Sequence, residues 1–406
     1  MAMAEGPEVP GMMVFRAPHR AMFLGGCVML LASFALWAIE IAARAGFIDG
    51  VTWMLPPAWM HALLILCGVF PFFIFGFLLT AMPRWQGLAD LSTGDWSWAW
   101  RLLAAGWCVS LAGMLLPGVL LPGLVLVLAG WVFLLRVLGG VALHRHPDRL
   151  HALLTFAALT AGCVALGAWL PAIVMQNAGW ARFATQAGLW WFLLPVFFTV
   201  CHRMVPFFSS NVIKPYVVVR PRWAFAVVAA SVMHGAFVMV GYEALTWIVD
   251  APAACIAIWL SWKWRLVAAL KVALLGMLHV GFAWLGIGLM LFAIQGFAAM
   301  FDTYLFGLAP LHAIGLGYFG SILLAMVSRV TLGHSGQALK ADRLTVMLFA
   351  ALQLVSLARI GADIGPASLS NGLMAASVAA WCLVFSAWAI RYAPSYWRAR
   401  VDGKPG

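Results

Sequence analysis

The chain has 406 residues, of which 65% are hydrophobic and only 9% are charged. A soluble domain of this length has too little interior to bury so much apolar surface, so the composition excludes a soluble protein. The formal net charge of +11 would suggest a nucleic-acid partner in a soluble chain, but the distribution of the charges explains it here and we expect no nucleic acid.

Apolar runs recur from one end of the chain to the other. A helix needs about 20 apolar residues to cross a bilayer, and it satisfies its own backbone hydrogen bonds in lipid. The alternating pattern of a closed barrel is not visible. We therefore predict an all-α polytopic membrane protein with about twelve transmembrane helices. The expected spans are 21–42, 58–82, 98–117, 119–142, 151–171, 186–208, 223–242, 245–262, 273–297, 309–331, 343–362 and 370–391.

The connections between these spans are short, and none has the composition of a linker or a soluble domain. We expect a cytoplasmic N-terminal segment over residues 1–20, a single membrane domain over 21–391 and a cytoplasmic tail over 392–406. The first apolar run is too long for a cleaved signal peptide, so it is counted as a span.

Lysine and arginine are distributed unevenly between the two sides of the predicted bundle. Of the 24 such residues, 21 fall at the two ends and in the even-numbered connections, and only Arg44, Arg182 and Arg359 fall in the odd-numbered ones. Cytoplasmic loops of membrane proteins carry this excess of positive charge. The pattern predicts that both termini are cytoplasmic and supports the count of twelve.

Three histidines fall in the outer half of this bundle. His61 and His312 lie near the outer ends of the second and tenth spans, and His234 lies in the outer half of the seventh. Ionisable groups in lipid are costly and usually face a cavity or a partner, and neutral imidazole is a favoured ligand of haem iron, copper and zinc. A hydrogen bond to a neighbouring helix, or a place at the interface, is the alternative for each.

Three more histidines, His202, His279 and His334, fall on the cytoplasmic side and form a candidate inner metal site. His312 and His334 are 22 residues apart, about 33 Å along a helix, so they cannot bind one metal ion. The tenth helix could instead serve two sites, one on each side of the membrane.

Arg84, Arg203 and Arg329 lie at the cytoplasmic ends of three spans. The positive-inside bias alone explains such positions. The alternative is that they bind an anion such as a haem propionate, because a guanidinium group donates two parallel hydrogen bonds to a carboxylate.

Four stretches resemble the NnrS family, bacterial inner-membrane proteins linked to the response to nitric oxide. They are LHAIGLGYFGSILLAMVSRVTLGHSGQ (311–337), GFLLTAMPRWQG (76–87), RMVPFFSSN (203–211) and LLGMLHVGFAWLGIGL (274–289). The resemblance implies a twelve-helix inner-membrane protein that carries haem, expected to be b-type, and copper, and that relieves nitrosative stress. Five residues fall on motif positions of the family: His61, His279, His312, Arg329 and His334. Nitric oxide or a related small ligand is then the expected partner besides the lipid bilayer, and the electron donor is unknown.

The chain departs from the family pattern at the second helix. The family often has Trp-His-Ala-His-Glu-Met there, and this chain has Met-His-Ala-Leu-Leu-Ile over residues 60–65, which keeps only the first histidine. His202 also stands where glycine is expected. These differences indicate a divergent branch.

Three functional hypotheses remain open at this point. In the first, His61 and His312 are axial ligands of a haem, a layout analogous to that of haem-copper oxidases, and His234 is a copper or distal-site residue. In the second the protein is a secondary transporter, because twelve helices are also common in that class. In the third it is a non-catalytic assembly or sensing protein.

Overall fold

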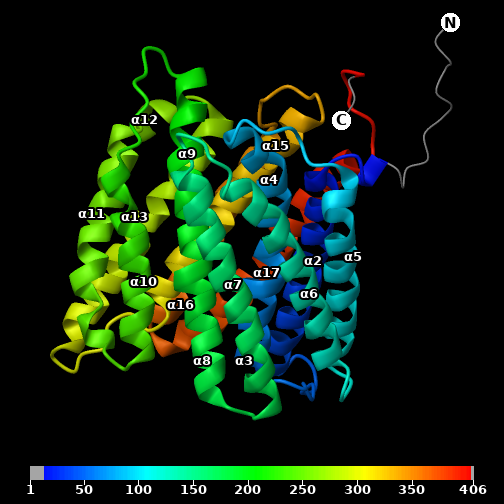
Figure 1. The fold of residues 1–406 in the computed structure, drawn as a ribbon. Helices are drawn as coiled ribbons and strands as arrows, with labels where there is room; N and C mark the ends of the chain where they lie inside the picture. Colours follow the sequence, from blue (N-terminus) through cyan, green and yellow to red (C-terminus); the bar gives the residue numbers. More distant parts are fainter. Residues whose placement is uncertain (1–12, 404–406) are drawn as a thin grey trace, which may run out of the picture.

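The computed structural model describes residues 13–403, which form a bundle of helices joined by short loops (Figure 1). No strand occurs in these residues, so the predicted all-α class is confirmed. The elements are α2 (Pro18–Arg44), α3 (Pro57–Leu63), η1 (Leu64–Val69), α4 (Phe70–Trp85), α5 (Thr93–Ala112), α6 (Leu120–Ala142), α7 (Leu150–Val174), α8 (Ala178–Gln186), η2 (Ala187–Leu193), α9 (Leu194–Val212), η3 (Arg222–Phe225), α10 (Ala226–Met239), η4 (Glu243–Leu245), α11 (Trp247–Lys263), α12 (Leu266–Ala269), α13 (Ala273–Ala299), α14 (Ala309–His312), η5 (Ala313–Gly320), α15 (Ser321–His334), α16 (Arg343–Ile364), α17 (Ala367–Tyr392) and η6 (Ala393–Tyr396). The parts of the expected terminal segments at 1–12 and 404–406 lie outside the described residues.

Ten helices of the described chain are long and apolar enough to cross a membrane, which shows a multi-pass membrane protein. The remaining two expected spans, 98–117 and 245–262, correspond to α5 and α11. Both are helical, and they pack along α6 and α13, but α11 has only 17 residues and neither helix is one of the ten. The count of twelve crossing helices stays a prediction.

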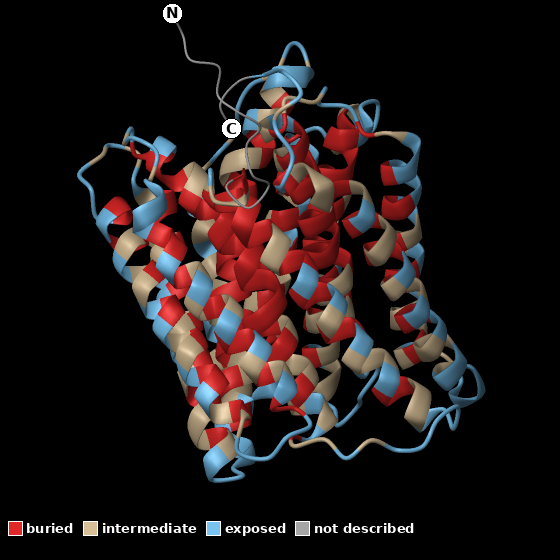
Figure 2. Ribbon diagram, turned by 90° about the vertical axis from the view of Figure 1, so that its right-hand side faces the viewer, coloured by how far each residue is buried: buried red, intermediate tan, exposed pale blue. Residues whose placement is uncertain are grey.

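Three long rods form the centre of the bundle. Each joins two α-helices through a π-helical segment, and we call them the central rods: Pro57–Trp85, Ala178–Val212 and Ala309–His334. In their most apolar windows 83%, 83% and 78% of the residues are buried, against 28–61% in the other seven apolar helices. Figure 2 shows this buried centre as red ribbon within helices of mixed colour. A helix hydrophobic on all sides needs such a surrounding layer.

Proline explains the π-helical segment in two of the central rods. Pro71 and Pro195 each come two residues after the end of the π segment, η1 and η2 respectively. Proline has no backbone N–H, so it cannot complete the usual helical hydrogen bond to the preceding turn. Segments of this kind are rare and frequently occur at functional sites.

A cluster of three phenylalanines joins the central rods, two of them just beyond η1 and η2 and the third near the end of η5. The ring centroids of Phe70 and Phe197 are 5.5 Å apart, those of Phe70 and Phe319 are 5.7 Å apart, and those of Phe197 and Phe319 are 4.7 Å apart. One ring comes from each rod. Aromatic pairs at such distances stabilise the packing beyond the area they bury.

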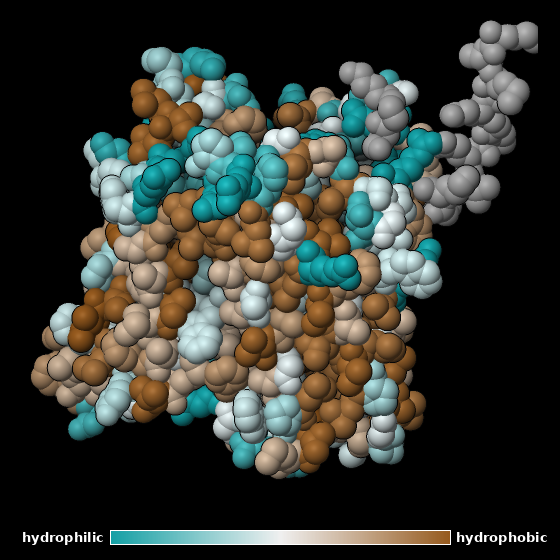
Figure 3. Space-filling view, in the orientation of Figure 1, coloured by the Kyte–Doolittle hydropathy of each residue, from teal (hydrophilic) through white to brown (hydrophobic). Residues whose placement is uncertain are grey.

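The two sides of the bundle differ in polarity. The described ends of the chain lie on the side where α4, α9 and α15 end, and Nη1 of Arg20 donates to the carbonyl of Arg398 at 2.8 Å there. We call this the basic side and the opposite one the far side. Figure 3 shows hydrophilic side chains gathered at the basic side above a hydrophobic band. The cytoplasmic placement of this side stays a prediction.

Candidate functional site

His61 and His312 lie near the far-side ends of two central rods, as the sequence predicts. His61 is in α3 and His312 ends α14, and a π-helical segment follows each within a few residues. The rods that carry them pack together, with the ring centroids of Phe70 and Phe319 5.7 Å apart. The fold therefore brings together two histidines that are far apart in the sequence.

Asp363 fixes the orientation of His312. Nδ1 of His312 lies 2.9 Å from Oδ2 of Asp363 and 2.9 Å from the Leu308 carbonyl, and because both partners are acceptors the proton is on Nδ1. Nη1 of Arg359 in turn pairs with Oδ1 of Asp363 at 2.8 Å. In the neutral imidazole this tautomer leaves the lone pair of Nε2 free to bind a metal, as in metal-ligating histidines that are held by a carboxylate.

Aromatic side chains from α2 hold the ring of His61. The ring stacks on Trp37 with centroids 4.3 Å apart and meets the edge of Phe34 at 6.4 Å. No residue among 13–403 forms a hydrogen bond with its nitrogens. A half-buried imidazole with free nitrogens, beside another whose Nε2 is free, provides the donor set that a haem iron with two axial histidines requires.

His234 forms a second histidine–carboxylate pair in the far-side half. Nδ1 of His234 in α10 lies 2.8 Å from Oδ1 of Asp250 in α11, and the two side chains are 2% and 1% exposed. The imidazole stacks on Trp190 with centroids 3.6 Å apart, and Phe292 covers its edge. A carboxylate again orients the ring, so Nε2 remains available as an acceptor or ligand.

An apolar cavity of about 50 Å³ lies among the central rods and α2. Phe73 and Phe77 line it from α4, Phe197 from α9, and Leu323 and Met326 from α15. Apolar cavities of proteins stay dry and accept small apolar molecules. This space therefore suits a small uncharged molecule rather than water or an ion.

His202 of the inner layer pairs with His151. Nε2 of His151 in α7 lies 3.1 Å from Nδ1 of His202 in α9, and both side chains are buried. Asp148, just before α7, pairs with Arg203 at 2.8 Å. Partial burial raises the pKa of the Asp148 carboxyl, but the hydrogen bond from Arg203 and the nearby positive charges together outweigh it, so the pKa lies below its ordinary value.

The other two inner histidines have partners of their own. Nε2 of His279 in α13 lies 2.9 Å from Oγ of Ser209, and since that hydroxyl donates to the Val205 carbonyl, the imidazole is the donor. His334 packs against His19 with ring centroids 4.4 Å apart. The structure thus shows His202, His279 and His334 in three separate pairs and not in one cluster.

The three candidate arginines differ in their partners. Arg84 forms two hydrogen bonds with the Asp90 carboxylate, at 2.9 and 2.8 Å, and Arg203 pairs with Asp148. Arg329 instead lies over the ring of Phe208, with Cζ 4.1 Å from the centroid.

The arginines and the far-side histidines belong to different sites. Arg329 comes 17 residues after His312 on the same rod, about 25 Å along a helix. A haem bound by His61 and His312 could not reach the arginines of the basic side.

No group of three or more histidine, cysteine, aspartate or glutamate side chains that could hold a metal ion occurs in residues 13–403. A haem needs only two axial ligands, so His61 and His312 are sufficient for it. The donor set for a separate copper ion is incomplete in this part of the chain.

Sequence reasoning missed Asp363 and the partner roles of His19 and His151. The signal for Asp363 was weak, since it is one residue beyond the expected end of a span and its pairing with Arg359 at four residues' spacing also occurs in ordinary exposed helices. His19 and His151 start their helices at the basic side, where a solvated histidine is equally compatible with the sequence.

No curated protein matches the chain. The profile of one family, described as NnrS protein, matches residues 13–400, which is nearly the whole chain. The match covers every helix and candidate residue described above, as the resemblance of the four stretches predicts, and the chain belongs to the NnrS family.

Proposed function

We propose that this protein binds a b-type haem through His61 and His312 and acts on nitric oxide or a related small ligand. The observation that carries the proposal is the placement of two imidazoles with free nitrogens near the far-side ends of adjacent central rods, one of them oriented by Asp363. Family membership supports the nitric-oxide part of the proposal. When bound, the haem would supply an iron that changes oxidation state and binds such a ligand.

The surrounding residues have distinct roles in this proposal. Asp363 holds the proton on Nδ1 of His312 and so increases the basicity of Nε2. Arg359 balances the charge of Asp363 at 2.8 Å. Trp37 and Phe34 restrict the rotation of the His61 ring and exclude water from one of its faces.

The apolar interior is consistent with a gaseous ligand. Nitric oxide is small and apolar, so it can enter from the lipid without a polar channel. The cavity of about 50 Å³ among the central rods offers it a dry space inside the bundle. We propose no copper ligand set, because the residues that could complete one around His234 are not grouped in the described part of the chain.

The orientation completes the proposal. We infer twelve crossing helices in the bacterial inner membrane, with both termini and the basic side cytoplasmic. The excess of lysine and arginine in the connections of that side supports this assignment. The haem would then lie near the periplasmic surface.

The test is an absorption spectrum of the detergent-purified protein as isolated, after dithionite and after nitric oxide, with iron and copper assayed on the same sample. We expect a Soret band that shifts on reduction and again with nitric oxide. His61→Ala and His312→Ala should each lose the band, whereas His144→Ala, in an exposed loop of the basic side, should keep it. Retained, unshifted spectra in both ligand variants would contradict the assignment. A protein that lacks haem after expression with ample haem, and that moves a substrate into vesicles, would favour a secondary transporter.

A further inference from the structure

Arg329 is a buried cation without a counter-ion. Its side chain lies in α15, and the residue is 7% exposed. None of its nitrogens forms a hydrogen bond or an ion pair with any residue of the described chain. A buried charge without a partner costs several kcal/mol, and an ionisable residue within a membrane helix usually indicates a functional site.

The pairing of the other arginines makes Arg329 distinctive. On the basic side, four arginines already pair with the carboxylates nearest to them. These pairs are Arg84–Asp90, Arg203–Asp148, Arg391–Asp342 and Arg400–Asp402. The other buried arginine, Arg20, donates to the Arg398 carbonyl. Arg329 alone, among the buried arginines of residues 13–403, has neither a carboxylate nor a carbonyl acceptor.

The surroundings of Arg329 limit what can bind there. Phe208 covers the guanidinium group, with Cζ 4.1 Å from the ring centroid. Met326, three residues earlier on the same helix face, lines the apolar cavity. The in-plane N–H edges of the guanidinium group remain, and these suit a planar oxyanion that accepts two parallel hydrogen bonds.

We propose that Arg329 is the binding residue of an anion site on the basic side of the bundle, about one helical turn beyond Met326 of the apolar cavity, and that its ligand is a carboxylate or another small planar oxyanion. Arg329 lies five residues, or about 8 Å, before the basic-side end of α15. The ligand therefore enters from the basic side. The carboxylate has two possible sources, a free anion or a bound haem other than the one held by His61 and His312. The site does not depend on the haem proposed above.

The experiment is a thermal-unfolding titration of the full-length protein in detergent, freed of haem, with sodium formate. Sodium chloride at equal ionic strength and formamide, the neutral analogue of formate, are the references. We expect a saturable rise in the unfolding midpoint of about 2 °C or more with formate only. Arg329→Gln should abolish the rise, and Arg329→Lys, which keeps the charge but not the planar group, should weaken it.

The matched control is Arg343→Gln, which removes an exposed arginine on the same side and should respond like the unmodified protein. The lysine variant keeps the test decisive if the glutamine variant does not fold. No saturable rise in the unmodified protein, or an equal rise in an Arg329 variant, would overturn the site.

Repeating the titration after loading with haem identifies the source. A lost response, together with a lower haem content in Arg329→Lys, assigns the carboxylate to haem. A retained response assigns it to a free anion. The Soret band of the unmodified protein tests haem binding by His61 and His312, so a failure of the proposed function is distinguishable from a failure of the Arg329 site.

Discussion

Oδ2 of Asp363 accepts a hydrogen bond from Nδ1 of His312 at 2.9 Å, although the two residues are 51 positions apart in sequence. The first prediction follows from this contact. Asp363→Asn removes the negative charge that keeps the proton on Nδ1, so the affinity for haem should fall about 10- to 100-fold. Haem titration followed at the Soret band measures it. Asp302→Asn, in an exposed loop on the same side, is the control, and equal affinities in the two variants would rule out an orienting role for Asp363.

Two glycines of one π-helical segment, η5, allow a matched test of how tightly this segment packs. A Cβ at Gly317 would lie 2.5 Å from Cδ2 of Trp284, whereas a Cβ at Gly315 would have nothing within 4 Å. Gly317→Ala should therefore destabilise the protein by about 1–3 kcal/mol through overpacking, and Gly315→Ala should be close to neutral. Thermal unfolding of the two variants in the same detergent checks this, and equal midpoints would show that Trp284 can move aside.

The buried pair of His234 and Asp250 should behave as a unit. Asp250→Ala leaves a buried imidazole N–H without its acceptor, and His234→Ala leaves a buried carboxylate without its donor. The losses of unfolding free energy in the two single variants should therefore add up to more than the loss in the double variant. The difference, the coupling energy, should be about 1–3 kcal/mol. Denaturant unfolding of the four proteins gives the cycle, and simple additivity would mean that the hydrogen bond contributes nothing.

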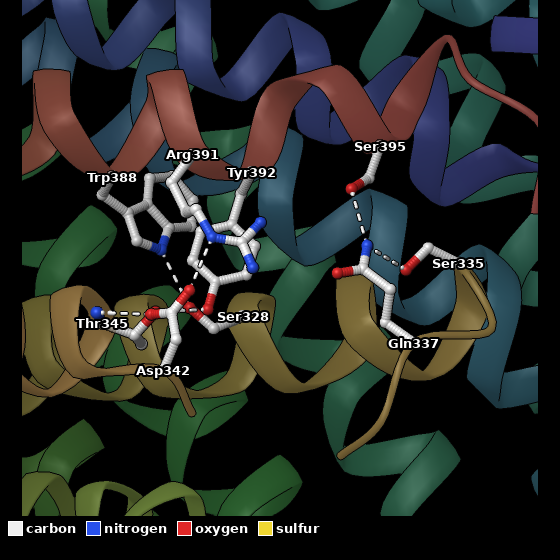
Figure 4. Close-up of polar contacts among 9 residues, drawn as sticks. All are labelled: Ser328, Ser335, Gln337, Asp342, Thr345, Trp388, Arg391, Tyr392 and Ser395. Atoms are coloured by element: carbon white, nitrogen blue, oxygen red, sulfur yellow. Dashed lines mark hydrogen bonds and ion pairs between the residues drawn. The ribbon is translucent and has the colours of Figure 1, made fainter. Parts of the chain in front are cut away.

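Asp342 makes stability dependent on acid pH. Its carboxylate accepts hydrogen bonds from the backbone and side chain of Thr345 and from Nε of Arg391 at 2.7 Å (Figure 4). Partial burial would raise the pKa of Asp342, but these hydrogen bonds outweigh it and lower the pKa to about 2.

The pKa of Asp342 in the folded protein is below the unfolded value of about 3.9. The stabilisation by its hydrogen bonds is therefore complete above the unfolded pKa, and it disappears as the pH falls through about 2. Asp342→Asn should be less stable at neutral pH and should lose less stability between pH 5 and pH 2. Solvent screening at this part-exposed site limits the size of the effect. Unfolding midpoints across that pH range, with Asp302→Asn beside them, provide the measurement, and parallel curves for the Asp342 variant and the unmodified protein would contradict it.

The sequence predicted the helices and the depth of the histidines better than it predicted their partners. Hydropathy and charge locate the ends of a span, so the placement of His61 and His312 near the same side followed from counting residues. Helices that are apolar on all sides carry little information about which face meets which neighbour. For that reason His202, His279 and His334, alike in depth, could be imagined as one cluster, although they point to three different partners.

The carboxylates show the same limit. Asp363 and Asp250 meet their histidines across helix–helix contacts, and no local pattern of residues specifies such a contact. The π-helical segments were also not predicted. Pro71 and Pro195 are visible in the sequence, but in a membrane helix a proline is compatible with a kink as well as with a π segment.

A π-helical segment divides each central rod into two α-helices. The rotation of one α-helix about the rod axis is therefore not fixed by the rotation of the other. Removing one residue from Ala313–Gly320 would turn the part that carries His312 by about 100° relative to the part that carries Arg329, with little change in length. The two sites on this rod are therefore separable by insertion and deletion as well as by substitution. A lineage could realign the haem ligand on one side of the membrane while the anion site on the other side kept its place.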